Sequence, residues 1–448
     1  MRAEDTERSS QKSAPCKQGE ETTLCLEPCR ERSFVHHLGT TAAAQTLSLA
    51  CGVLTGVLTA RLLGPKGKGE LAALVLWPTT IVFFVSMGIN QALVFYMGKK
   101  RFTLSELWTT SMVIGLGQSA LAILAGLAII PFALRHYSHD VYILALAVLF
   151  SSPFIILGGY PANLLQGQMD LNSFNMIQLV APFAYALSLV VLAILHAANL
   201  LDIVVWRVAS CVIAFVFGYF LLLKKADLRI SWNAGASLDM LKFGGKTQLG
   251  NISNYVNRSV DQLLLSVLVP PRDLGLYVVA VTVSLALNFL PQAAGIVTLA
   301  AGSNADAAGA IAVVGRSFRL SLFCLLGGCA LLFMAAPILI ARVFGPAYLG
   351  SILPCRILLP GAVAVGLSQV LYDGARSLGD PALASYSEGC AVLVTVICLA
   401  IFLPWFGFVG AAIASTVAYL SSLCVTLILY KIRFGVKPAQ LLLLTRAA

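Results

Sequence analysis

The sequence predicts an all-α integral membrane protein with about twelve transmembrane helices in two six-helix bundles. Three observations predict this class. The 448-residue chain is 58% hydrophobic and only 11% charged, whereas soluble domains carry about 25% charged residues. Apolar stretches long enough to cross a bilayer follow one another from Leu38 onward. A short loop pattern recurs about six spans later, which indicates two related halves.

Short polar loops separate the predicted spans, whose limits are 38–60, 71–97, 108–134, 141–165, 173–197, 203–223, 247–270, 275–300, 320–341, 350–372, 382–403 and 407–430. We therefore expect a disordered tail (1–37), an amino-terminal lobe (38–225), a linker (226–246), a carboxyl-terminal lobe (247–433) and a second tail (434–448). The first tail contains cysteines and histidines that match no zinc-site spacing, so we predict no metal site. These residues are Cys16, Cys25, Cys29, His36 and His37.

The distribution of basic residues predicts the orientation in the membrane. With the first tail in the cytoplasm, inner loops and tails hold about 21 Lys and Arg residues, and the opposite side holds about six. Both termini are therefore expected to be cytoplasmic. The net charge of +10 then reflects topology, so no nucleic-acid partner is expected.

An internal repeat supports the two halves. The loop after the first span places Gly69 four residues after Pro65, and the loop after the seventh places Gly275 four residues after Pro271. The inner loops at 165–170 and 375–380 also correspond. An offset of six spans is even, so the halves have the same orientation and are related by an axis along the membrane normal.

A polar stripe marks the seventh span, from Gln248 to Gln262. At 100° per residue, its polar side chains fall within an arc of about 140°. The stripe contains Asn251, Asn254, Asn257, Arg258, Asp261 and Gln262. A charge at mid-membrane costs about 2.5–3.5 kcal/mol, so this face is expected to look onto other helices or water. A structural seam with an Arg258–Asp261 pair is one interpretation; the wall of a hydrated transport cavity is the interpretation we favour.

Related helices carry weaker stripes. Small and polar residues on the first span, including Gln45, project within about 80° of arc. Asn288 and Gln292 lie on one face of the eighth span, and Asn90 and Gln91 lie near the inner end of the second. Such residues often indicate only close helix packing. Their occurrence on four related helices favours a shared central cavity.

Four loop motifs carry a resemblance to a known family. They are G-P-K-G-K-G-E-L (from Gly64), V-P-P-R-D-L-G-L-Y (from Val269), V-F-G-P-A-Y-L-G (from Val343) and P-W-F-G-F-V-G-A-A-I-A-S (from Pro404). In order and topology, the chain resembles the Wzx-like oligosaccharide and polysaccharide flippases. Their superfamily includes multidrug and toxin extrusion transporters and the lipid II flippase. The resemblance implies a central cavity lined by spans one, two, seven and eight. It also implies alternating-access transport of a polyprenyl-(pyro)phosphate-linked oligosaccharide to the outer leaflet, in the inner membrane of a bacterial cell.

Such transport requires a wet groove with hydrogen-bonding amides and a cation for phosphate. We expect Arg258 to meet the anionic headgroup, and Asp261 either to balance Arg258 or to bind a coupling H⁺ or Na⁺. The headgroup path is expected to be lined by Asn251, Asn254, Asn257, Asn288, Gln292, Gln45, Asn90 and Gln91. Lys66 and Lys68 make the first outer hairpin cationic. For Arg207, extension to the membrane surface is the interpretation we favour, and contact with lipid headgroups is the alternative; we expect Glu388 to be interfacial.

Enzyme motifs are absent from the sequence, which predicts no catalytic residue and no cofactor. The expected partners are the lipid-linked oligosaccharide, membrane lipid, and the glycan polymerase and glycosyltransferases of cell-surface polysaccharide biosynthesis. A multidrug or cation antiporter of the same superfamily is the alternative. A membrane glycosyltransferase or polymerase is disfavoured, because its larger loops with acidic catalytic residues have no counterpart here.

Overall fold

A computed structural model describes residues 28–195, 199–225, 227–289, 291–292, 294–295, 298, 307–380, 382–436 and 440–441, with backbone only for 28–39, 42 and 307–308. Regular structure within these ranges is helical throughout, as predicted. A bilayer favours this outcome because helices satisfy their backbone groups internally. The Cys and His residues of the first tail lie outside the residues whose side chains are described.

The longer helices are α1 (Pro28–Val85), α2 (Ile89–Gly98), α3 (Leu104–Ala133), α4 (His139–Phe150), α5 (Ser152–Gly167), α6 (Leu171–Leu195), α7 (Leu200–Lys225), α8 (Ala234–Leu268), α9 (Pro271–Leu285), α11 (Ala307–Leu339), α12 (Ile352–Ser377) and α13 (Ala382–Phe434). Three short helical turns are η1 (Ala286–Asn288), η2 (Ile340–Phe344) and η3 (Pro346–Ser351). Helix α1 begins at Pro28, before the predicted start of the first span at residue 38.

Two helices are folded back on themselves at a glycine. Helix α1 breaks at Gly64 (φ 67°) and α13 at Gly407 (φ 56°), both in the left-handed region that glycine tolerates best. Across the first break, Lys68 Nζ donates to Thr59 Oγ1 at 2.7 Å. Each helix therefore contributes two antiparallel arms.

The predicted spans have helical counterparts one by one. Over the described residues, eight helical stretches are long and apolar enough to cross a membrane, and they include the two that fold back. Helices α8 and α9 match the seventh and eighth predicted spans but fall outside this group. Charged and amide side chains interrupt α8, and α9 has only 15 residues.

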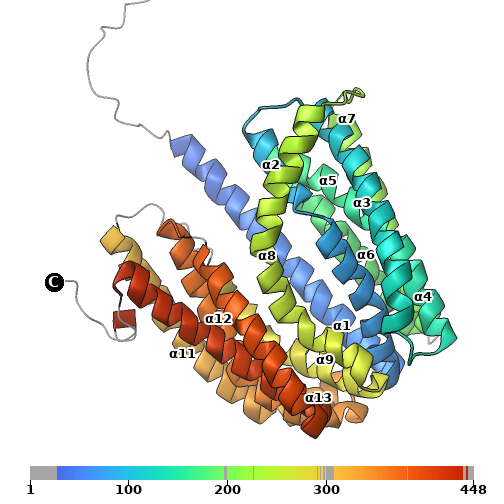
Figure 1. The fold of residues 1–448 in the computed structure, drawn as a ribbon, viewed down its shortest axis with the longest axis vertical. Coiled ribbons are helices and arrows are strands. Elements are labelled where there is room, and N and C mark those ends of the chain that lie inside the picture. Colours follow the sequence, from blue (N-terminus) through green and yellow to red (C-terminus); the bar gives the residue numbers. More distant parts are fainter. Residues whose placement is uncertain are drawn as a thin grey trace, which may run out of the picture.

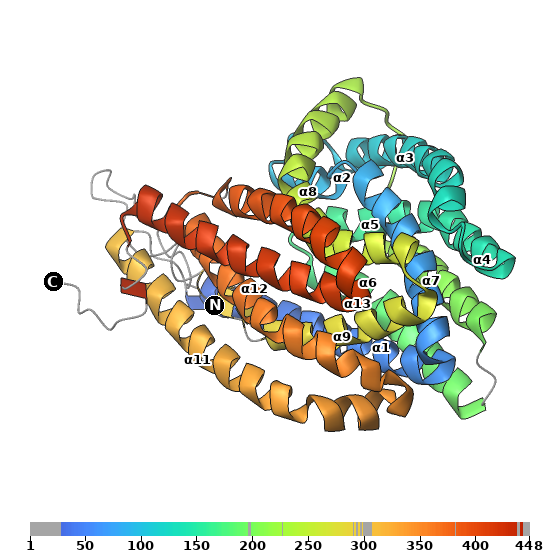
Figure 2. The same cartoon turned by 60° about the horizontal axis from the view of Figure 1, so that its bottom comes forward.

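The helices form two lobes (Figures 1 and 2). Helices α3 to α7 pack around α1 in one lobe, with α2 against α5 and α3, while α9, α11, α12 and α13 form the other. Helix α8 packs against α13 and also against α2 and α3 of the first lobe. The lobes meet along α1 and α9 and diverge away from that contact.

The two repeated hairpin loops meet where the lobes join. The Cβ of an alanine at position 69 would lie 1.7 Å from the Pro271 carbonyl oxygen, and one at position 275 would lie 1.9 Å from that of Pro65. Only a residue without a Cβ permits this approach. We call this end of the molecule, where Pro65–Gly69 meets Pro271–Gly275, the hairpin end. The two loops of the predicted repeat are therefore in contact with each other.

The opposite end carries the second predicted correspondence. Asp170 N donates to Leu165 O and Asp380 N to Ala375 O, both at 2.9 Å. Each carboxylate then pairs with a cation late in the last helix of its lobe: Asp170 with Lys225 and Asp380 with Arg433. Equivalent positions in the two lobes therefore form equivalent turns and ion pairs. We call this the loop end.

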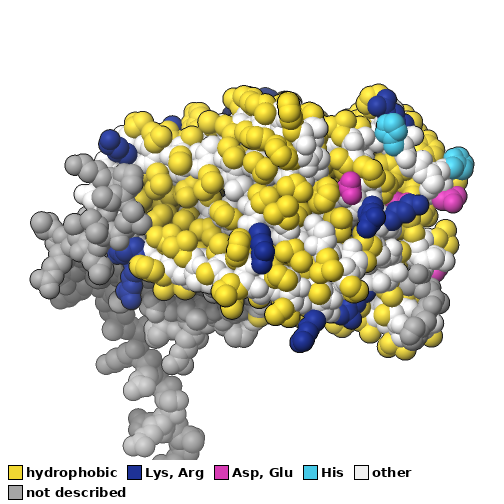
Figure 3. Space-filling view, turned by 90° about the horizontal axis from the view of Figure 1, so that it is seen from below, with side chains coloured by type: hydrophobic (Ala, Val, Ile, Leu, Met, Phe, Trp, Pro, Cys, Tyr) yellow, Lys and Arg dark blue, Asp and Glu magenta, His cyan; other side chains and the backbone are white. Residues whose placement is uncertain are grey.

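The lobes expose a broad apolar surface (Figure 3). Phe323, Met334 and Trp405 are 71%, 77% and 82% exposed. Exposure on this scale is not tolerated on a water-soluble monomer, and it fits contact with acyl chains. The interior is held by small and medium apolar residues instead, such as Ala60, Leu74 and Ala280.

Candidate functional site

A cavity of about 730 Å³ lies between α8 and the second lobe, with Phe83 of α1 also in its wall, and we call it the central cavity. Its walls come from α1, α8, α12 and α13, with Gln292 from the segment after η1. The lining side chains are Phe83, Asn251, Asn254, Tyr255, Arg258, Ser259, Gln292, Gln369, Tyr372, Arg376, Ala384, Ser385 and Glu388, beside Gly250. Most of these groups are polar, so the cavity suits a hydrated ligand.

Arg258 projects into this space from the middle of the polar stripe on α8. Its side chain is exposed, and within the described part of the chain it forms no hydrogen bond or ion pair. It also lines a smaller cavity of about 270 Å³, with Asn288 and Gln292. A guanidinium with five free donors is suited to a phosphate group.

The prediction that Arg258 and Asp261 form an ion pair is wrong. Asp261 is 2% exposed and accepts hydrogen bonds from the Tyr277 hydroxyl (2.5 Å) and the Ser415 hydroxyl (2.9 Å). The i,i+3 spacing permitted a pair, but packing of α8 against α9 and α13 turns Asp261 into the second lobe. Arg258 is left facing the cavity.

Asn257 also faces the second lobe, although we expected it on the headgroup path. It is 4% exposed, and its Nδ2 donates to Glu388 Oε2 at 2.6 Å. Its Oδ1 accepts from Thr395 Oγ1 at 3.1 Å. Both ends of this amide are used by α13, so it joins two helices and does not line the central cavity.

The remaining predicted side chains divide into two groups. Asn251, Asn254 and Gln292 line the central cavity with Arg258, and Asn288 lies in the adjoining smaller cavity. Gln45, Asn90 and Gln91 line none of the cavities described here. Gln45 and Gln91 are exposed. Asn90 packs beside Gly159 of α5, and its buried Oδ1 accepts no hydrogen bond from the described residues.

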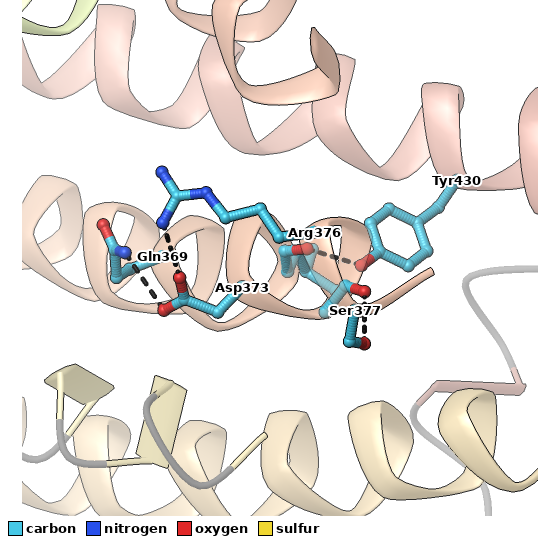
Figure 4. Close-up of polar contacts among 7 residues, drawn as sticks. Gln369, Asp373, Arg376, Ser377 and Tyr430 are labelled. Atoms are coloured by element: carbon cyan, nitrogen blue, oxygen red, sulfur yellow. Dashed lines mark hydrogen bonds and ion pairs between the residues drawn. The ribbon is translucent and has the colours of Figure 1, made fainter. Parts of the chain in front are cut away.

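Helix α12 supplies polar groups that the sequence analysis did not assign to the site (Figure 4). Asp373 accepts from Arg376 Nη1 at 2.8 Å and from Gln369 Nε2 at 3.1 Å. Arg376 retains a half-exposed side chain and lines the central cavity. Its position near the end of a span marked it only as a topological charge. Spacing within α12 (369, 373, 376) places all three on one helix face.

Glu388 is a further correction. We expected it at the interface, but it is 8% exposed and lines the central cavity. Besides Asn257, the Tyr372 hydroxyl donates to it at 3.1 Å. The sequence signal for this position is an acidic residue seven positions into a span. A carboxylate buried there requires hydrogen-bond partners such as Asn257 and Tyr372.

Arg207 was expected to extend to the membrane surface. It is instead half-buried, lies over the Tyr185 ring at 5.3 Å and lines two cavities. The aromatic face and the cavities provide an alternative to the surface.

Comparison with solved structures identifies the fold. The lipid II flippase MurJ in an inward closed conformation aligns with a TM-score of 0.74 at 15% identity, over 90% of this chain and 88% of that one. An inward-facing multidrug resistance MATE transporter gives 0.74 at 14% identity, over 87% and 94%. A transporter from Pyrococcus furiosus gives 0.63 at 13% identity, over 90% and 96%. The fold is therefore that of the MOP-superfamily transporters, which are multi-pass membrane proteins.

The family follows from the sequence itself. Residues 58–353 match the profile of the family described as polysaccharide biosynthesis protein, over about two thirds of the chain. The chain belongs to this family. No curated protein sequence matches it.

Proposed function

We propose that this protein flips a polyprenyl-(pyro)phosphate-linked oligosaccharide from the inner to the outer leaflet by alternating access, for cell-surface polysaccharide biosynthesis. The observation that carries the proposal is Arg258, a guanidinium that forms no hydrogen bond or ion pair with the described residues and lines the polar central cavity. Arg376 adds a second cation. Charge-assisted hydrogen bonds from arginine are strong and suit phosphate oxygens.

The other cavity groups suit a sugar. Asn251, Asn254, Gln292 and Gln369 line the same space, and amides both donate to and accept from hydroxyl groups. Tyr255 stacks on Phe83 at 3.9 Å between ring centroids and forms an apolar part of the wall. The lipid tail would remain among acyl chains while the headgroup crosses here.

The orientation is part of the proposal. We place the loop end in the cytoplasm and the hairpin end outside, with both termini cytoplasmic, in a bacterial inner membrane. The excess of Lys and Arg in the loops at that end supports this orientation. Glycosyltransferases would supply the substrate, and a glycan polymerase would use the product.

Reconstitution tests the function directly. Proteoliposomes containing the purified protein should exchange a fluorescent lipid-linked oligosaccharide between leaflets, and Arg258→Gln should slow the exchange by about tenfold or more, because one charge-assisted contact is lost. Arg356→Gln is the matched control, since Arg356 lies over the Phe333 ring (4.7 Å) outside the central cavity. Equal rates for wild type and Arg258→Gln would contradict the assignment.

A cation antiporter is the second candidate, and Glu388 on the cavity wall favours it. Under that function, an imposed H⁺ or Na⁺ gradient would drive a cationic dye such as ethidium across proteoliposomes in the direction opposite to the ion, and Glu388→Gln would abolish the movement. The buried carboxylates Asp261 and Glu388 are also our candidates for a coupling ion in the flippase. Dependence of lipid exchange on either gradient would support that role.

A further inference from the structure

A second cavity, of about 320 Å³, lies inside the fold-back of α1. Residues from both arms line it, joined by Tyr185 of α6, Arg207 of α7, Gln262 of α8 and Val278 of α9. Two of the lining side chains, Lys68 and Arg207, are cationic, and no described lining residue is acidic. We call this the hairpin cavity.

Lys68 is buried, with 9% of its surface exposed. Its Nζ donates to Thr59 Oγ1 at 2.7 Å and to Gly56 O at 3.2 Å, and among the described residues it has no carboxylate partner. Lys66, two residues earlier, is the contrast: its side chain is 77% exposed and its Nζ lies 3.8 Å from Glu70 Oε1. A lysine is rarely buried without an anion.

Arg207 brings the second charge from a different helix. Its guanidinium lies over Tyr185 at 5.3 Å, and it forms no ion pair within the described ranges. It borders both the hairpin cavity and a neighbouring space of about 330 Å³, whose described lining also contains no acidic residue. The amide of Gln262 lines the hairpin cavity as well.

The hairpin cavity is connected to the central cavity through a smaller cavity that shares lining residues with both. Gly52 borders the hairpin cavity and also the cavity of about 270 Å³ that contains Asn288. That smaller cavity shares Arg258 and Gln292 with the central cavity. Three adjoining spaces thus run from the central cavity toward the hairpin end, and each is bordered by at least one cation.

We propose that Lys68 and Arg207 form a second binding site for a phosphate-type anion, separate from the one at Arg258. The inference rests on the proposed function in one respect: the phosphate of the lipid-linked substrate would pass from Arg258 to this site as the lobes change state. Two cations without carboxylate partners among the described residues, set in an open cavity, provide the charge and donors that such an anion requires.

Binding can be measured without transport. The purified full-length protein in phosphatidylcholine nanodiscs would be titrated with inorganic pyrophosphate and with farnesyl pyrophosphate, in a background carrying Arg258→Gln and Arg376→Gln. That background should retain binding. Adding Lys68→Met or Arg207→Gln should weaken it by about tenfold or more, while Lys68→Arg should largely restore it.

Matched controls separate a site from general charge loss. Lys66→Met removes a cation from the same hairpin, and Arg356→Gln removes one that also lies over an aromatic ring; neither should change binding. If Lys68→Met fails to fold because Thr59 and Gly56 lose a donor, Arg207→Gln decides alone. Absence of binding in the Arg258→Gln/Arg376→Gln background, or equal binding with and without Arg207, would overturn the site.

Two further measurements identify the occupant. If the site holds a bilayer phospholipid, phosphatidylglycerol in the nanodiscs should compete with farnesyl pyrophosphate, and this result would overturn the assignment of the site to the substrate. Farnesyl pyrophosphate binding that is undiminished by phosphatidylglycerol would support the assignment. In proteoliposomes, Arg207→Gln should slow lipid-linked oligosaccharide exchange with binding at Arg258 intact. Normal exchange would overturn the passage, whereas no exchange by the wild type would reject the proposed function and leave the pyrophosphate titration to decide the site.

Discussion

Replacing Gly69 by alanine should force the hairpin end open. The added Cβ would lie 1.7 Å from the Pro271 carbonyl oxygen, about 1.3 Å short of the 3.0 Å that such atoms keep. The obstacle is backbone, so no side-chain rotation relieves it. Overpacking of this kind costs about 1–3 kcal/mol, which corresponds to a shift of about 5–150-fold between two states. The state with parted hairpins should gain that factor.

Spin labels on the two hairpins report this equilibrium. In a cysteine-free background, Lys66→Cys and Arg272→Cys can both be spin-labelled because these residues are exposed. Double electron–electron resonance should then give one short distance, because the two loops touch. Gly69→Ala should add a longer distance, and Gly275→Ala should do the same by symmetry. Gly117→Ala is the control, since nothing lies within 4 Å of its Cβ. An unchanged distance distribution in both hairpin variants would refute the reasoning.

Three further changes should act on stability, measured by thermal unfolding in detergent. Asn257→Ala should destabilise by about 1–3 kcal/mol, because the buried carboxylate of Glu388 loses a donor at 2.6 Å; equal melting of wild type and variant would count against that network. Gly88→Ala should cost about 1–3 kcal/mol, since position 88 has φ 63° and its Cβ would meet a carbonyl of α8 at 2.4 Å; an unaffected variant would show that this contact is easily relieved. Partial burial raises the pKa of Asp170, but hydrogen bonds from Lys225 and Ser173 outweigh it and hold that pKa below its ordinary value. The pair should therefore stabilise by less than about 1 kcal/mol at neutral pH and lose this effect as pH falls below about 4, a loss that Lys225→Met should remove from the pH profile.

Hydropathy and repetition determined most of the architecture. A bilayer leaves the backbone few choices, so long apolar stretches predict helices, and glycines in short loops predict the turns. The prolines and glycines at 65–69 and 271–275 predicted two related hairpins, and the structure brings them into contact. Asp170 and Asp380 likewise occupy equivalent turns. These features depend on local backbone geometry, which short sequence patterns encode.

The orientation of individual polar side chains was decided only by tertiary packing. Arg258, Asn257 and Asp261 belong to one stripe of α8, yet the first lines the central cavity and the other two are enclosed by the second lobe. An arc of about 140° is wide enough to face a cavity along one edge and a neighbouring helix along the other. Helical periodicity specifies the face, whereas the partners on α9, α12 and α13 depend on contacts distant in the chain. Contacts distant in the chain also explain why Arg376, Glu388 and Arg207 line cavities.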